Sequence, residues 1–117
     1  MRHLKKGKKF GRLQGQRVSF LRNLANDLIR AGKIETTETR VKVIRPIVEK
    51  LITIAKGQDL AARRLLIKRV HNKDIAEKLY GELGPRYATR PGGYLRITKL
   101  GTSRKRDGSR LARIEFV

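Results

Sequence analysis

The sequence contains no cysteine and no tryptophan, and it has no long hydrophobic run. Without cysteine, neither a disulfide framework nor a cysteine-based zinc site can form. The longest apolar runs, such as residues 65–67, are far too short to span a bilayer. The basic residues 1–17 are not followed by the apolar stretch of a signal peptide. We therefore expect a soluble, cytoplasmic protein that has no membrane segment.

Residues suited to catalysis are also scarce. The two histidines, His3 and His71, have no carboxylates near them at the spacing of a metal site. Gly92 and Gly93 lack both the spacing and the following helix of a phosphate-binding loop. The acidic residues are scattered over expected helix surfaces. The sequence thus predicts no enzymatic activity, no metal, no cofactor and no small-molecule substrate.

Positive charge, in contrast, is abundant. The 117 residues include 30 Lys and Arg but only 10 Asp and Glu, which gives a formal net charge of +20. Solubility of a small domain needs a net charge of only about 2–8, and repulsion between like charges opposes a compact fold. The excess predicts a polyanionic partner, with nucleic acid first and an anionic membrane surface second. A membrane-active helix would need a lysine-rich polar face, whereas the first expected helix has Asn23, Asn26 and Asp27 there.

The charge is concentrated at the two ends of the chain. Residues 1–26 hold eight basic and no acidic residues, and residues 83–117 hold nine basic and two acidic ones. Residues 27–82 mix both signs, as an ordinary globular surface does. We expect the ends to make the contacts and the middle to serve as the scaffold.

Residues 1–16 are expected to form an extended basic arm. Glycine recurs through them at Gly7, Gly11 and Gly15, and apolar residues are few, so the segment cannot bury enough surface to fold alone. Its cationic side chains can neutralise many phosphates. The candidate RNA contacts in this part of the chain are Arg2, Lys5, Lys6, Lys8, Lys9, Arg12 and Arg17.

Residues 17–117 are expected to form a single compact α+β domain with about four helices packed on a small sheet. Apolar spacing places the helices near residues 17–31, 38–55, 60–70 and 73–83. Residues that favour helix ends lie at their boundaries. These are Gly32 after the first helix, Thr36 or Thr37 before the second, Asp59 before the third and Asn72 before the fourth.

Two helix breakers and one helix face give sharper predictions. Pro46 predicts a kink or a break in the second helix, because an interior proline loses a hydrogen bond and clashes with the preceding turn. Gly84 and Pro85 predict a firm end to the fourth helix. The first helix is expected to bury the apolar face Val18, Leu21, Leu24, Ala25, Leu28 and Ile29, with Asn26 on the opposite, exposed face.

The strands are expected at the C-terminal end. Residues 94–100 and 111–117 alternate between apolar and polar side chains, and the loop between them is rich in Gly, Ser and Arg, so they predict a β-hairpin. A hairpin alone is marginally stable in water. We therefore expect it to pack on the helices, with a short strand near residue 34 as a third member of the sheet.

Two further basic clusters lie in this C-terminal part. In residues 84–99, Tyr87 and Tyr94 accompany cations, a combination that suits base stacking together with phosphate contacts; packing of both rings in the body is the alternative. The cations there are Arg86, Arg90, Arg96 and Lys99. The hairpin loop carries the second cluster, Arg104, Lys105, Arg106 and Arg110, with Asp107 as its only acid.

Several segments resemble, in the same order, the bacterial large-ribosomal-subunit protein seventeen family. They include residues 1–3 with the glycine-spaced arm after them, and residues 21–24, 34–37, 51–56 and 114–117. The most specific is Glu82-Leu83-Gly84-Pro85-Arg86-Tyr87, followed by Arg90, Gly92-Gly93-Tyr94 and Arg96-Ile97. The resemblance covers essentially the whole chain.

This resemblance implies a structural, non-enzymatic constituent of the large ribosomal subunit in the cytoplasm. It implies that the chain binds large-subunit ribosomal RNA near the peptide exit side, beside neighbouring large-subunit ribosomal proteins. By position it adds His3 to the arm contacts and assigns Arg86, Arg90 and Tyr94 as contacts. The alternative is a non-ribosomal DNA- or RNA-binding architectural protein, although no recognition helix stands out.

Overall fold

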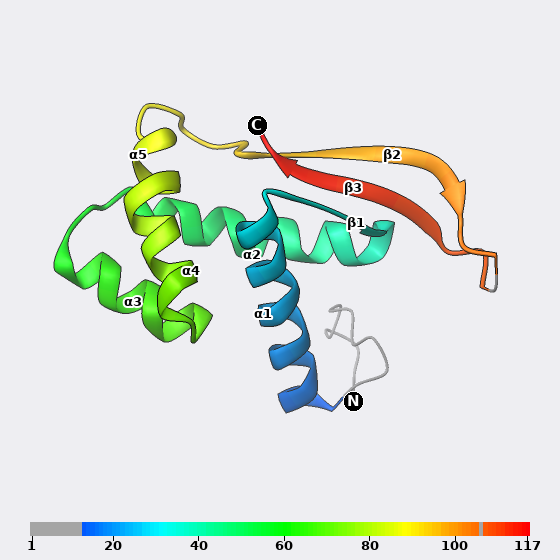
Figure 1. Cartoon of the computed structure of the whole chain (residues 1–117), viewed down its shortest axis with the longest axis horizontal. Helices are drawn as coiled ribbons and strands as arrows, with labels where there is room; N and C mark the ends of the chain where they lie inside the picture. Colours follow the sequence, from blue (N-terminus) through cyan, green and yellow to red (C-terminus); the bar gives the residue numbers. More distant parts are fainter. Residues whose placement is uncertain (1–12, 106) are drawn as a thin grey trace, which may run out of the picture.

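The computed structural model describes residues 13–105 and 107–117. Helices α1 (Gln14–Ala31), α2 (Glu38–Ala55) and α3 (Leu60–Val70) are followed by α4 (Lys73–Lys78), a π-helical turn (Leu79–Leu83) and the short α5 (Gly84–Arg86). The strands are β1 (Lys33–Thr37), β2 (Leu95–Ser103) and β3 (Arg110–Phe116). Figure 1 shows α3, α4 and α5 at one end of α2 and the hairpin of β2 and β3 extending beyond its other end. The expected α+β class, with helices packed on a small sheet, is confirmed.

The helix ends follow the predicted capping residues. Thr37 accepts a hydrogen bond from the Arg40 amide at 3.4 Å, and Asp59 accepts one from the Ala62 amide at 2.7 Å. Asn72 accepts from the first amides of α4. Gly32 ends α1 in the left-handed conformation, with a φ of 85°. Side-chain oxygens at these positions satisfy amides that have no partner within the helix, so each cap fixes where its helix starts.

Helix α1 begins at Gln14, three residues earlier than expected, because Gly15 weakens a helix without breaking it. Its buried side chains belong to the C-terminal half, where Leu28 and Ile29 are fully buried, whereas Val18 is 52% exposed. Assignment of Val18 to the buried face was therefore wrong. Placement of Asn26 on the exposed face was wrong as well: its side chain is 8% exposed and donates to the Val70 carbonyl at 3.0 Å.

Helix α2 lies at the centre of the fold and runs unbroken through Pro46. All six of its fully or nearly buried residues are those that the apolar spacing predicts: Val41, Ile44, Val48, Leu51, Ile52 and Ala55. Pro46 is exposed, so water can satisfy the Lys42 carbonyl that the proline leaves without an amide partner. The predicted break is absent for this reason.

The predicted helix end at Gly84 and Pro85 was also wrong. The helix continues from α4 through the π-helical turn into α5, which ends at Arg86, and Gln58 Nε2 donates to the Tyr80 carbonyl in the turn before Pro85. Gly84 meets the end of α2 closely: a Cβ there would lie 2.6 Å from the Ala55 carbonyl oxygen. Glycine therefore allows close contact between two helices here and does not end the helix.

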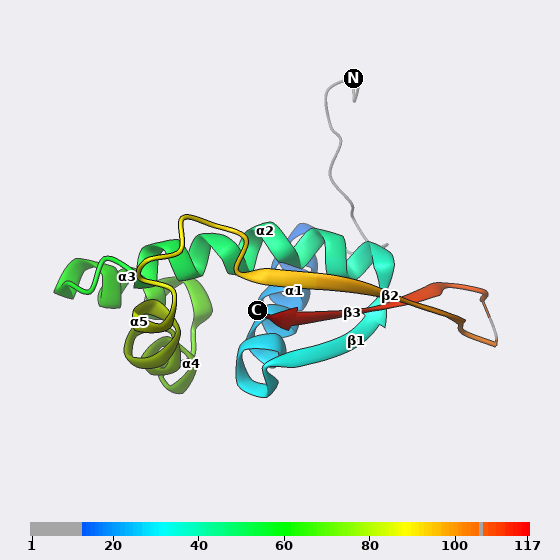
Figure 2. The same ribbon diagram turned by 90° about the horizontal axis from the view of Figure 1, so that it is seen from above.

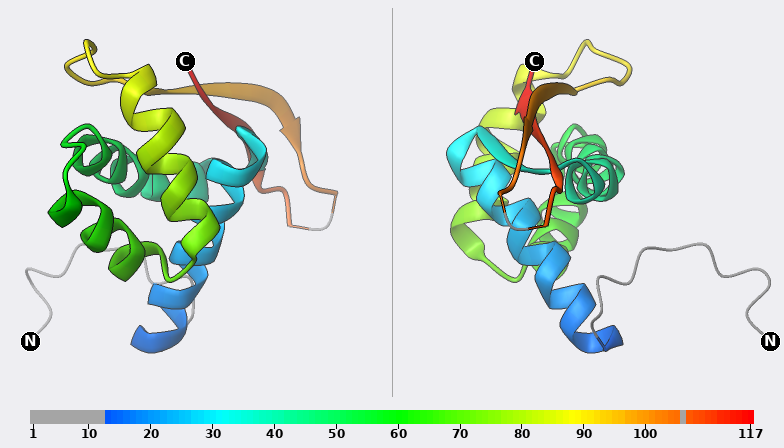
Figure 3. Two further views of the ribbon diagram at one scale, coloured as in Figure 1. Left: turned by 60° about the vertical axis from the view of Figure 1, so that its left-hand side comes forward. Right: turned by 90° about the vertical axis from the view of Figure 1, so that its right-hand side faces the viewer.

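The sheet is antiparallel with the order β1-β3-β2. Ile114 of the central strand is opposite Ile34 on one side and Ile97 on the other, and it is fully buried. The predicted hairpin and the third strand near residue 34 are confirmed. Figure 2 shows α2 lying alongside the strands, and Figure 3 shows the hairpin tip standing clear of the helices. The sheet and helices thus share one core, and the tip stays open to a partner.

Candidate nucleic-acid interface

The segment between α5 and β2 is tied to the end of α2 by one lysine. Lys56 Nζ donates to the Arg90 carbonyl at 2.6 Å and to the Tyr94 hydroxyl at 3.0 Å. The Val117 amide donates to the Tyr94 carbonyl at 3.0 Å, which joins the segment to the end of β3. A loop that carries exposed arginines is therefore fixed at both of its ends.

Both tyrosines of this segment are buried. Tyr87 is 4% exposed and Tyr94 is 2% exposed, and their ring centroids lie 5.2 Å apart at an interplanar angle of 53°. The Tyr87 hydroxyl donates to the Val117 carbonyl at 2.7 Å. Packing, the alternative left open by the sequence, is what the structure shows. Stacking of nucleobases on these rings is contradicted, because protein atoms already cover their faces.

The pKa values of the two tyrosine hydroxyls are shifted in opposite directions. Burial raises the pKa of Tyr87, and the nearby guanidinium groups of Arg86 and Arg90 only partly oppose it. Hydrogen bonds from Lys56 and Thr53 lower the pKa of Tyr94, because they favour its phenolate form. The contrast in pKa reflects their surroundings: hydrogen bonds from Lys56 and Thr53 dominate at Tyr94, whereas burial dominates at Tyr87.

The two arginines beside these rings are exposed, and both donate hydrogen bonds to backbone carbonyl groups of the protein. Arg86 donates to the Val117 carbonyl at 2.9 Å and lies over the Tyr87 ring at 5.2 Å. Arg90 Nε donates to the Gly92 carbonyl at 3.1 Å. Each guanidinium has five donors in a rigid fork, so both retain N–H groups for an anion. Together with Thr89 and Pro91 they line an open hollow of about 760 Å³.

Arg96 and Lys99 extend the positive charge along β2. Both side chains are exposed. Arg96 is opposite Glu115 in the register, and Lys99 is opposite Ala112. Because they are three positions apart on one strand, the two side chains project from opposite faces of the sheet, and each adds exposed positive charge between the α5–β2 segment and the hairpin tip.

The hairpin tip forms a second cationic cluster. Arg104 pairs with Asp107 at 3.7 Å, and Lys105 is exposed. Hydrogen bonds from Ser109 lower the pKa of Asp107. Arg104 and Arg110 line a hollow of about 490 Å³ together with the first turn of α2, which adds Arg40. Arg106 lies outside the described residues.

Sequence reasoning missed two residues, one in the first turn of α2 and one directly after its last turn, that serve these clusters. Arg40 lies 5.1 Å from the Phe20 ring and beside the hairpin tip, and Lys56 holds the α5–β2 segment. Their positions at the two ends of α2 are visible in the sequence, but only the fold shows which loops reach them. Of the predicted arm contacts, Arg17 is half-buried in the first turn of α1. The others, Arg2, His3, Lys5, Lys6, Lys8, Lys9 and Arg12, lie outside the described residues.

The two C-terminal clusters lie at opposite ends of the hairpin, as Figure 1 shows. Within residues 13–105 and 107–117, no group of three or more His, Asp or Glu side chains could hold a metal ion. In the same part of the chain, no helix is long and apolar enough to cross a membrane. Exposed cations are the feature that the two C-terminal clusters share.

A sequence model of the family described as ribosomal protein L17 matches residues 20–117. The chain belongs to the ribosomal protein L17 family. It is similar to the protein named large ribosomal subunit protein bL17 from Gemmatimonas aurantiaca, with 55% identity over all of this chain and 98% of the relative. It is also similar to the proteins of that name from a Hydrogenobaculum species and from Lawsonia intracellularis. The Hydrogenobaculum protein is 48% identical over 100% of this chain and 99% of the relative. The Lawsonia intracellularis protein is 45% identical over 99% of this chain and 92% of the relative. The resemblance found in the sequence motifs is confirmed.

Proposed function

We propose that this protein is a structural constituent of the large ribosomal subunit, in the cytoplasm, and that it binds large-subunit ribosomal RNA. Membership of the ribosomal protein L17 family carries this proposal. A net charge of +20 supports it, because the charge exceeds what solubility requires. The chain is a structural component and not an enzyme, in agreement with its family and with the scarcity of catalytic residues.

We propose that RNA phosphates contact three cationic regions. The first is the arm, which the sequence predicts over residues 1–16 and of which residues 14–16 belong to α1. The second comprises Arg86, Arg90, Arg96 and Lys99, whose side chains are exposed. The third is the hairpin tip, with Arg104, Lys105, Arg106 and Arg110, to which the structure adds Arg40. Tyr87 and Tyr94 act beneath this surface by holding the backbone that carries the arginines.

Phosphate contacts position a protein on nucleic acid without reading its sequence. Apart from Arg40, the described cations of the second and third regions lie between residues 86 and 110, toward both ends of a hairpin, rather than on one helix. Such a distribution suits the irregular surface of a folded RNA, and it offers no helix shaped to read a DNA groove. This favours ribosomal RNA over the DNA-binding alternative.

We further propose, from the family resemblance, that the protein lies near the peptide exit side of the subunit. Neighbouring large-subunit ribosomal proteins would share that surface with the RNA. Chemical cross-linking within purified large subunits would place it: linkage to proteins that line the exit is expected, and linkage only to proteins of the opposite face would contradict this location.

Co-sedimentation tests the function itself. The tagged protein is expected to sediment with large subunits after a wash in high salt, and to be released only when the subunit unfolds. Recovery with DNA, or in the unbound fraction under the same wash, would contradict the proposal and favour a non-ribosomal architectural protein.

A further inference from the structure

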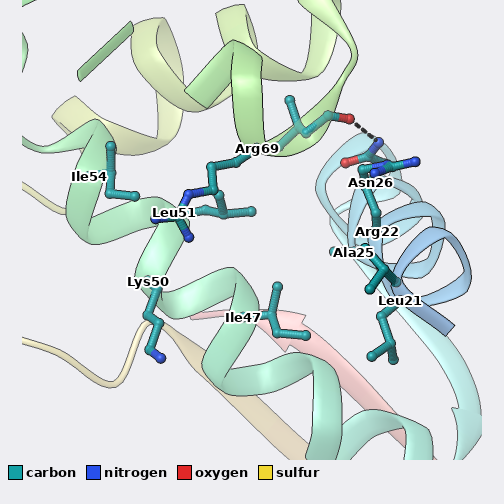
Figure 4. A pocket seen from close by; sticks show the side chains of 11 residues that line it. Leu21, Arg22, Ala25, Asn26, Ile47, Lys50, Leu51, Ile54 and Arg69 are labelled. Carbon is teal, nitrogen blue, oxygen red and sulfur yellow. Dashed lines mark hydrogen bonds between the residues drawn. The ribbon is translucent and has the colours of Figure 1, made fainter. Parts of the chain in front are cut away.

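A groove lies between α1, α2 and the end of α3, away from the two C-terminal cationic clusters. Its side walls are the apolar residues Val18 and Leu21 of α1 and Ile47 and Ile54 of α2, and its volume is about 330 Å³. Figure 4 shows these helices facing one another across the opening. Val18 is 52% exposed, although it continues the apolar face that α1 buries elsewhere. The groove therefore leaves apolar surface open that the fold itself does not cover.

The rim of this groove is basic. Arg22, Lys50 and Arg69 line it, one from each of the three helices. Within residues 13–105 and 107–117, none of these three forms an ion pair with a carboxylate, and Arg22 donates to the Ser19 hydroxyl. An apolar slot with three cations around it fits an occupant that presents an apolar side chain next to negative charge.

The buried end of the groove contains an acceptor that lacks a donor. Asn26 Nδ2 donates to the Val70 carbonyl, and within the described chain Asn26 Oδ1 has no hydrogen-bond partner. Figure 4 shows this oxygen turned toward the groove. A buried acceptor without a donor is costly. An occupant that brings an N–H group, as every peptide backbone does, could satisfy it after a small side-chain rotation.

Three candidate occupants fit less well. A second copy of the chain and the basic residues 1–12 carry charge of the same sign as the rim. An extruded nucleobase would place its polar edge mainly against Leu, Ile and Val side chains inside the slot, where Asn26 is the one polar lining residue besides the cations of the rim. Buried polar groups without partners lose binding free energy.

We propose that this groove docks an extended segment of another protein of the large subunit, one that carries a large apolar side chain flanked by Asp or Glu. The inference rests on the proposed function, because it assumes that the protein resides in that subunit. The apolar side chain inserts between α1 and α2, and the carboxylates pair with Lys50 and the arginines on the rim. The groove then serves a protein neighbour, and the cationic clusters serve RNA.

The test uses large subunits assembled with the full-length chain carrying a photo-reactive benzoylphenylalanine at Val18. Light is expected to yield a ribonuclease-resistant cross-link to a protein segment in which an apolar residue lies within about three positions of Asp or Glu, the reach of neighbouring side chains along an extended strand. The matched control carries the same group at Leu60, which is 58% exposed but lies outside the groove. It should not capture that segment.

A charge-matched pair of variants then tests the rim. Lys50→Glu should lower the yield of the Val18 cross-link by roughly threefold to tenfold, because an attraction becomes a repulsion at the groove. Lys42→Glu makes the same change in net charge on an exposed part of α2 outside the groove, and it should leave the yield unchanged.

A cross-link to RNA, no cross-link, a captured segment without a carboxylate, or a yield that Lys50→Glu leaves intact would each overturn the docking proposal. Failure of the proposed function would look different, because the chain would then be absent from the purified subunits before any light is applied.

Discussion

The ammonium group of Lys56 lies 2.6 Å from the Arg90 carbonyl oxygen, so a residue that follows α2 holds the backbone of a cationic loop 34 positions later in the chain. The same group lies 5.2 Å from the centroid of the Tyr94 ring. Lys56 is half-buried, and its donors point at protein acceptors. We therefore assign it a positioning role in RNA binding rather than a phosphate contact.

Lys56→Met is expected to weaken binding to a ribosomal RNA fragment while leaving the salt dependence of binding unchanged. The number of phosphate contacts stays the same, but the loop that presents Arg90 loses its anchor. The measurement is the binding constant across a salt series. The matched variant Arg90→Gln removes a proposed contact and should reduce the slope by roughly 0.7–0.9 log units per log unit of salt. Equal loss of slope in both variants would show that Lys56 is itself a contact.

Deletion of residues 1–12 is expected to make the salt dependence of RNA binding shallower. It removes Arg2, Lys5, Lys6, Lys8, Lys9 and Arg12. If all six contact phosphate, the slope falls by up to about 4–5. The melting temperature of the free protein should barely change, because α1 begins only at Gln14. A deletion that unfolds the domain would refute the division into arm and body, and an unchanged slope would assign binding to the two C-terminal clusters.

Leu28→Ala is expected to destabilise the protein by roughly 2–5 kcal/mol, because Leu28 is fully buried and its removal leaves a cavity in the core. Leu24→Ala, one turn earlier on α1, should cost less, since Leu24 is only partly buried. Chemical denaturation of both variants measures the difference. Equal losses would mean that the part of α1 before Ala25 is covered as completely as the part after it.

Gly84→Ala is expected to destabilise the fold by roughly 1–3 kcal/mol, the usual cost of forcing an extra carbon into a packed site. The new Cβ would lie 2.6 Å from the Ala55 carbonyl oxygen, a backbone atom that cannot easily move. The control is Gly81→Ala, three residues earlier in the π-helical turn, where nothing lies within 4 Å of the added atom. This control should be neutral or stabilising, because alanine favours a helix. Thermal melts of both variants decide between close packing and helix termination as the reason for Gly84.

The sequence predicted the structure correctly wherever interactions between residues close in sequence decide it. Thr37, Asp59 and Asn72 cap their helices because their side chains reach amides two or three positions away, and the apolar stripe of α2 follows helical spacing. Of the kink or break predicted at Pro46, the break is absent, and the helix end predicted at Gly84 and Pro85 lies after Arg86. The burial of Tyr87 and Tyr94 depends on Val117 and Lys56, which are distant in sequence, so spacing alone left stacking and packing equally open.

The continuity of α2 has a mechanical consequence. Arg40, in its first turn, lies beside the hairpin tip. Lys56, directly after its last turn, donates a hydrogen bond to the α5–β2 loop. Eighteen residues at about 1.5 Å each make a rod of roughly 27 Å. Insertion or deletion of a single residue within this rod would turn one end by about 100° relative to the other. The length of α2 and the rotation between its two ends therefore set the distance and the relative direction of the two cationic clusters. Only phosphates of a rigid RNA that match this distance and direction can contact both clusters at once.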